Sequence, residues 1–189
     1  FKGTWLKQFD KADTREEDFT LAGGQTVKVQ MMNRADQDAR FNYAETEDAQ
    51  ILEMLYKGKE LSMLVFLPKE GGLAALEESL TAENLAQWKS QLREQRVNVY
   101  LPKFTFTTKY TLNGPLEALG MPLAFSDSAD FSGMNGSNDL SIQAVVHQAF
   151  VEVNEEGTEA AAATGVSVGV TSVPQIAFFR ADRPFLFLI

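Results

Sequence analysis

The chain contains no cysteine and only one histidine among its 189 residues. The absence of cysteine excludes disulfides, thiolate catalysis and Cys-ligated metals, and it fits either a reducing or an oxidising compartment. With one imidazole, a metal site would have to be built from carboxylates, and the acidic run Glu16, Glu17 and Asp18 is more typical of a solvated surface. We therefore expect no metal and no cofactor.

Basic residues are outnumbered, and long apolar runs are missing. There are 17 Lys and Arg residues against 26 Asp and Glu residues, which gives a net charge of −9. Because no Lys/Arg-rich stripe is available to neutralise phosphates, the composition excludes a nucleic-acid partner. No apolar run approaches the roughly 20 residues that a helix needs to span a bilayer, so we expect no membrane partner.

The two ends predict that the chain is one part of a larger fold. It begins at Phe1 without a methionine or a polar leader, and it ends inside the apolar run 184–189. An apolar strand needs neighbours that pair its backbone groups and cover its faces. We expect the remaining elements to lie in another chain or to be absent.

Hydrophobic patterns predict strands over most of the chain. Val27, Val29 and Met31 alternate with polar residues, which is the period of a half-buried strand. Further strands are predicted at 51–56 and 61–67, joined by a hairpin at 57–60, at 97–101 and 104–106, separated by Pro102, and at 140–153.

Helix signals are fewer. Thr81 is a candidate N-cap for a helix through Leu85, Trp88 and Leu92, and a short helix is predicted at 73–79. Pro115 and Gly120 frame a third helix around 116–119. Many strands with few short helices predict an α+β fold, and the lack of repeats or linkers predicts a single domain over 1–189.

Residues 154–184 carry an unusual pattern. Alternate residues from Thr158 to Val170 are small and then apolar, whereas those from Glu159 to Thr171 are small or polar throughout. That alternation is typical of a strand with one face on a core. The four alanines 160–163 and two glycines nevertheless favour strand structure only weakly. Two interpretations stay open: an insertable loop, or an ordinary small-residue loop or inner strand.

A hydrolase is disfavoured by the context of its motif. Residues 165–169 read Gly-Val-Ser-Val-Gly, which matches a nucleophile elbow. Such an elbow needs a helix after the serine and a later histidine. Here Val173 and Pro174 follow shortly, and His147 precedes the motif. We expect no enzymatic activity and assign no catalytic residue.

The stretch 155–164, Glu-Glu-Gly-Thr-Glu-Ala-Ala-Ala-Ala-Thr, resembles the hinge of the reactive-centre loop in inhibitory serpins. Other blocks follow in the family's order over nearly the whole chain. They are Phe1-Lys2-Gly3-Thr4-Trp5, Leu101-Pro102-Lys103-Phe104, Leu116-Glu117-Ala118-Leu119-Gly120-Met121, Ala129-Asp130-Phe131-Ser132-Gly133-Met134, Val146-His147-Gln148-Ala149 and Ala181-Asp182-Arg183-Pro184-Phe185. The family's N-terminal helices and final strand are missing from the sequence.

The resemblance implies a serpin fold, with large mixed sheets, short helices and an exposed reactive-centre loop at about 155–175. It also implies a serine protease inhibitor that acts as a metastable suicide substrate. The protease attacks the loop and forms an acyl-enzyme, and the freed loop inserts into the main sheet and traps the protease.

Site residues follow from the same resemblance. Counting fourteen residues from Thr158 places the reactive bond at Thr171–Ser172, which suggests an elastase-like protease with a small S1 pocket. Sheet opening is expected to be controlled by Trp5, Lys103 and His147, with Lys103 paired to Glu155. The expected hinge consists of Glu155, Glu156, Gly157, Thr158, Glu159, Ala160, Ala161, Ala162, Ala163 and Thr164.

Within the hinge, Gly157 is expected to supply backbone freedom, and Thr158 to be the first inserted side chain. The expected partners are such a protease and the remaining part of the serpin chain. The expected location is extracellular, as a secreted protein, or periplasmic, with a cytoplasmic one left open. Two alternatives remain: a non-inhibitory serpin that acts as a carrier or chaperone, or an inactive truncated or cleaved fragment.

Overall fold

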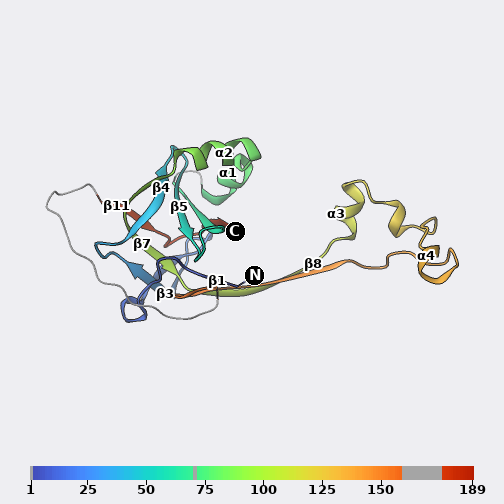
Figure 1. Ribbon diagram of the computed structural model, residues 1–189, viewed down its shortest axis with the longest axis horizontal. Helices are drawn as coiled ribbons and strands as arrows, with labels where there is room; N and C mark the ends of the chain where they lie inside the picture. Colours follow the sequence, from blue (N-terminus) through green and yellow to red (C-terminus); the bar gives the residue numbers. More distant parts are fainter. Residues whose placement is uncertain (1, 70–71, 159–175) are drawn as a thin grey trace. The chain divides into compact units, whose positions relative to one another are not determined.

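The computed structural model describes residues 2–69, 72–158 and 176–189. These residues form two compact units (Figure 1). Unit 1 contains Phe1–Phe104 and Glu152–Ile189, and unit 2 contains Thr105–Val151. The single domain over 1–189 stays a prediction.

A large sheet dominates unit 1. Within the described residues it has eight strands, in the order β12-β6-β5-β4-β7-β3-β2, with β11 added in parallel to β7. Its strands are β2 (Arg15–Thr20), β3 (Thr26–Arg34), β4 (Arg40–Glu45), β5 (Ala49–Leu55), β6 (Ser62–Pro68), β7 (Arg93–Pro102), β11 (Ala177–Arg180) and β12 (Leu186–Leu188). The antiparallel register pairs Ile51 with Phe66 and Tyr43 with Leu52.

Two helices pack beside this sheet. They are α1 (Gly72–Ser79) and α2 (Ala82–Gln91), which lie next to each other in Figure 1. Leu76 of α1 and Trp88 of α2 are buried against Ile51 and Phe66, and the rings of Phe66 and Trp88 lie 5.6 Å apart. Burying large apolar side chains of this kind supplies most of the stability of such a layer.

Several sequence predictions are confirmed in unit 1. The hydroxyl of Thr81 accepts a hydrogen bond from the Asn84 amide at 3.1 Å, as an N-cap should. The predicted hairpin joins β5 and β6, with Gly58 and Lys59 at positive φ values of 94° and 61°. Strand β7 ends at Pro102, and the next strand begins at Phe104.

Unit 2 is built around a two-stranded sheet with short helices. The strands are β8 (Phe104–Thr111), whose first residue belongs to unit 1, and β9 (Val146–Val153), whose last residues belong to unit 1. The helical elements are α3 (Asn113–Ala118), η2 (Leu123–Phe125) and α4 (Ser132–Asn135). The third predicted helix is confirmed as α3, and Gly120 follows it with φ 102°.

The strand predicted at 140–153 is wrong in its first half. Strand β9 begins only at Val146. Upstream, the amide of Val145 donates to the side chain of Asn113, and the amide of Ile142 donates to the carbonyl of Ala124. Because these backbone groups bond to the helical segment of unit 2, they do not extend the strand ladder.

Unit 1 also contains three short elements in the part of the chain that the structure describes. Strand β1 (Gly3–Thr4) pairs antiparallel with β10 (Gly157–Thr158), and the short 3-10 helix η1 (Lys11–Asp13) follows β1. Within the described residues, the structure contains no helix that is both long enough and apolar enough to cross a membrane.

Candidate functional site

The predicted hinge begins with a tight turn, which we call the hinge stem (residues 154–158). The amide of Asn154 donates to the carbonyl of Gly157 at 3.1 Å, and the amide of Gly157 donates back at 3.3 Å. The side-chain oxygen of Asn154 also accepts from the amides of Glu156 and Gly157, at 3.0 and 3.2 Å. Asparagine suits this position because its side chain can bond to backbone groups two residues ahead. The turn directs the chain back antiparallel to the end of β9.

Gly157 lies where two backbones almost touch. Its φ is +137°, and an added Cβ would lie 2.2 Å from the carbonyl oxygen of Gly3, 2.7 Å from the Cα of Thr4 and 2.9 Å from the amide nitrogen of Trp5. Real Cβ atoms do not approach backbone atoms so closely. The expected backbone freedom of Gly157 stays a prediction, but in this conformation the glycine is required for steric reasons.

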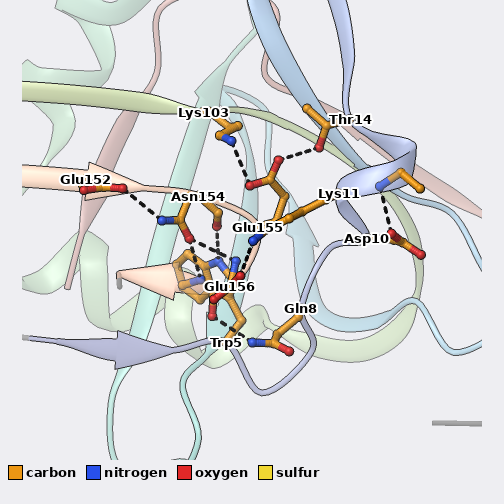
Figure 2. Close-up of polar contacts among 12 residues, drawn as sticks. Trp5, Gln8, Asp10, Lys11, Thr14, Lys103, Glu152, Asn154, Glu155 and Glu156 are labelled. Atoms are coloured by element: carbon orange, nitrogen blue, oxygen red, sulfur yellow. Dashed lines mark hydrogen bonds and ion pairs between the residues drawn. The ribbon is translucent and has the colours of Figure 1, made fainter. Parts of the chain in front are cut away.

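Trp5 forms one wall of the hinge stem (Figure 2). Its side chain is fully buried and stacks on Tyr56 with ring centroids 4.6 Å apart. The indole Nε1 donates to the carbonyl of Asn154 at 2.9 Å, and the backbone amide of Trp5 donates to the carbonyl of Glu156 at 3.0 Å. A buried indole N–H requires such a partner, so the ring both fills space and holds the turn.

Glu155 is the buried charge of the site, with only 2% of its surface exposed. One carboxylate oxygen pairs with Nζ of Lys103 at 3.0 Å, and the other accepts from the Thr14 hydroxyl at 2.8 Å. Burial alone would raise the pKa of Glu155, but its backbone hydrogen bond, Lys103 and Thr14 together lower that pKa below its ordinary value. The expected Lys103–Glu155 pair is therefore present, and its acidic partner is ionised.

Glu156 also has side-chain partners. Its carboxylate forms an ion pair with Lys11 of η1, and its carbonyl accepts from Nε2 of Gln8 at 3.2 Å. The hydrogen bond to Glu156 raises the pKa of Lys11. The lysine side chain is 66% exposed, whereas the glutamate side chain is 14% exposed. Water screens such a pair, so it contributes to orientation more than to stability.

The structure brings together only part of the predicted site. Trp5, Lys103, Glu155, Glu156 and the backbone of the hinge stem meet in unit 1 (Figure 2). His147 lies on β9 in unit 2, where its side chain is exposed, and its predicted role in sheet opening stays a prediction. The side chain of Thr158, the hinge residues 159–164 and the predicted reactive bond Thr171–Ser172 lie outside the described residues.

Sequence reasoning missed Asn154, Thr14, Lys11 and Gln8, whose side chains all form polar contacts in the site. Asn154 had a local signal, because an asparagine three residues before a glycine is typical of a tight turn. Thr14 and Lys11 had none, since they lie 141 and 145 residues away from the glutamates they contact. Together the contacts pair the polar groups of the stem with other protein groups, so the arrangement is suited to holding a backbone conformation.

Known proteins are similar to this chain over its whole length. A family model described as Serpin (serine protease inhibitor) matches residues 1–189. Serpin B3 of Homo sapiens is 48% identical, over 100% of this chain and 49% of that protein. Leukocyte elastase inhibitor A of Rattus norvegicus is 43% identical, over 100% of this chain and 52% of that protein.

Solved structures show the same fold. Human thyroxine-binding globulin matches with a TM-score of 0.86 and 29% identity, over 99% of this chain and 49% of that chain. The chain thus spans about half the length of these relatives. Because the family model matches every residue and the fold agrees, the chain belongs to the serpin family.

Proposed function

We propose that the full-length protein inhibits a serine protease as a suicide substrate, by inserting its cleaved reactive-centre loop into a sheet. The observation that carries the proposal is the antiparallel pairing of Gly157 and Thr158 with β1. These residues stand just before the small-residue segment 160–164. A strand already started at that point can lengthen residue by residue once the far end of the loop is cut.

The mechanism follows from strand geometry and from the chemistry of deacylation. About 14 inserted residues at ~3.3 Å each would carry the attached protease on the order of 45 Å. An acyl-enzyme is hydrolysed only while its oxyanion hole and general base keep their geometry. A protease pulled against the serpin body loses that geometry, so the acyl-enzyme persists. The protein acts as an inhibitor and not as a catalyst.

We assign an elastase-like target to the same site. Counting from Thr158 gives Thr171 before the scissile bond, and a small side chain there fits a small S1 pocket. The similarity to leukocyte elastase inhibitor A supports this assignment. A loop that works on a protease in the surroundings of the cell fits the secreted or periplasmic location that we propose.

A carrier function is the second candidate, because human thyroxine-binding globulin matches the fold with a TM-score of 0.86. A carrier has no need of a loop that inserts. The alanine-rich residues 160–163 and the preformed strand start both favour the inhibitor, since bulky or charged residues there would oppose insertion.

The test is to incubate the full-length protein with an elastase-type and a trypsin-type serine protease. We expect an SDS-resistant covalent complex with the elastase-type enzyme and loss of its activity. A Thr158→Arg variant is the control: a charged side chain at the start of the inserting strand should yield cleaved loop and free, active protease. Simple cleavage of the wild-type protein, with both proteases still active, would refute the proposal.

A further inference from the structure

The inserting strand is already started in the uncut chain. Residues 1–189 are continuous, yet Gly157 is paired with Thr4 and Thr158 with Gly3, as antiparallel strand neighbours. On its other side, Gly157 forms an antiparallel bridge to Asn154. The backbone of Gly157 is therefore enclosed between β1 and the residue that follows β9, in the manner of an inner strand.

One side chain organises this strand start. Asn154 uses its side-chain oxygen for the amides of Glu156 and Gly157, and its Nδ2 donates to Glu152 at 3.1 Å. Its carbonyl accepts from Nε1 of Trp5 at 2.9 Å. Figure 2 shows these bonds meeting at Asn154. Without the side chain, the Glu156 amide loses its acceptor within the protein.

The outer side of the turn is held independently of Asn154. The amide of Trp5 donates to the carbonyl of Glu156 at 3.0 Å, and the amide of Phe9 donates to the carbonyl of Glu155 at 3.0 Å. These two bonds fix where the turn lies along the segment 5–9. Because successive strand residues point to opposite faces, a slip of one residue would turn every later side chain of the loop to the wrong face. The turn therefore sets the register of whatever strand follows it.

We propose that Asn154 is a positioning residue, which docks Gly157 and Thr158 before cleavage and sets the register of the inserting strand. This inference rests on the proposed inhibitory function. After acylation, insertion competes with hydrolysis of the acyl-enzyme. A docked start removes the slow first step of insertion, since pairing continues from an existing strand end, and so directs the acyl-enzyme toward the trapped complex.

The magnitude follows from the bonds that Asn154 makes. Removing its side chain deprives the Glu156 amide of its acceptor and leaves the Gly157 amide only the backbone carbonyl of Asn154. A loss of about 1–2 kcal/mol of this kind changes an equilibrium by a factor of about 5–30. We expect the ratio of cleaved, released inhibitor to trapped complex to rise by about that factor in Asn154→Ala. The rate of the first attack on the loop should stay unchanged, because the reactive bond is remote in sequence.

The first experiment measures this ratio with full-length variants and an elastase-type protease. Asn154→Ala should raise it, whereas Asn154→Asp combined with Glu152→Gln should restore it. The double variant keeps an acceptor for both amides and reverses the donor and acceptor in the contact between the two side chains. Asn135→Ala is the matched control, because Asn135 also caps a local turn, through the Ser137 amide at 3.0 Å, but lies in unit 2.

The second experiment is independent of inhibition. Hydrogen exchange in the uncut full-length protein should show protected amides at Glu156 and Gly157, with protection reduced about 5- to 30-fold in Asn154→Ala. Rapid exchange of both amides in the wild type would overturn the docked start. The docked start would also be overturned if the wild type forms complex and Asn154→Ala gives the same ratio of cleaved inhibitor to trapped complex. Protected amides without any complex would instead refute the proposed function and leave the docked turn established.

Discussion

Replacing Gly157 by alanine should undock the hinge stem, and the size of the effect can be worked out from the structure. At φ +137° an added Cβ would stand 2.2 Å from the carbonyl oxygen of Gly3. The obstructing atoms belong to the backbone of β1, so no side chain can rotate away. Either alanine is held in a strained conformation, or the stem separates from β1 and loses its hydrogen bonds.

Strain and undocking both lower the free energy of unfolding by a similar amount. A residue held in a sparsely populated backbone conformation costs about 1–3 kcal/mol, and each lost hydrogen bond costs about 1 kcal/mol. We expect Gly157→Ala to lower the free energy of unfolding by about 2–4 kcal/mol. The sign is opposite to the usual effect, because Gly→Ala at a site that tolerates it stabilises a protein by about 0.4–1 kcal/mol.

The assay is equilibrium urea unfolding of the full-length protein, followed by circular dichroism, with Gly23→Ala as the matched control. A Cβ added at Gly23 meets nothing within 4 Å, and its φ lies outside the range that disfavours other residues. We expect this control to be neutral or slightly stabilised. If Gly157→Ala unfolded within about 0.5 kcal/mol of the wild type, as most surface substitutions do, the close approach of the two backbones would be refuted.

Two further changes probe the walls of the stem. Glu155→Gln removes a carboxylate whose pKa is lowered in the folded state. The difference in the free energy of unfolding between wild type and variant should therefore be fully present above the ordinary pKa of 4.5 and should become smaller as the pH falls below it. Urea unfolding from pH 3 to 8 measures this difference, and an increase on acidification would contradict the ion pair with Lys103. Trp5→Phe keeps a ring beside Tyr56 but loses the indole hydrogen bond to Asn154. We expect the free energy of unfolding to fall by about 1 kcal/mol in the same assay, and the hydrogen exchange of the stem amides to become faster. Leu61→Ala is the control: it changes an exposed side chain of a hairpin and should leave both measurements unaltered.

The regular elements could be predicted wherever their signals are local. The cap at Thr81 and the hairpin at Gly58 depend on neighbours within a few residues, and both were predicted from the sequence. The segment 140–145 has the composition of a strand, but its backbone groups found partners in the helical part of unit 2. Composition reports what a segment favours and not which partner is available.

The site residues likewise include some that the sequence could predict and some that it could not. The hinge at 155–164 was predicted from its resemblance to the serpin hinge, because the order of small residues by itself left an ordinary loop or inner strand open. Sequence also singled out Gly157, although for its flexibility. Its steric role could not be predicted, since the obstructing atoms belong to β1, more than 150 residues away along the chain.

The sequence alone therefore predicted the family and the pairing of Lys103 with Glu155, through a resemblance that depends on residue types in a fixed order. Only the tertiary structure decided that Asn154, Thr14 and Lys11 belong to the site and that Gly157 and Thr158 pair with β1. Trp5 meets Asn154 across 149 residues of chain. Contacts between residues so far apart in the sequence form only when the chain folds. Folding then gives buried polar groups a carbonyl, an amide or a charge as their partner.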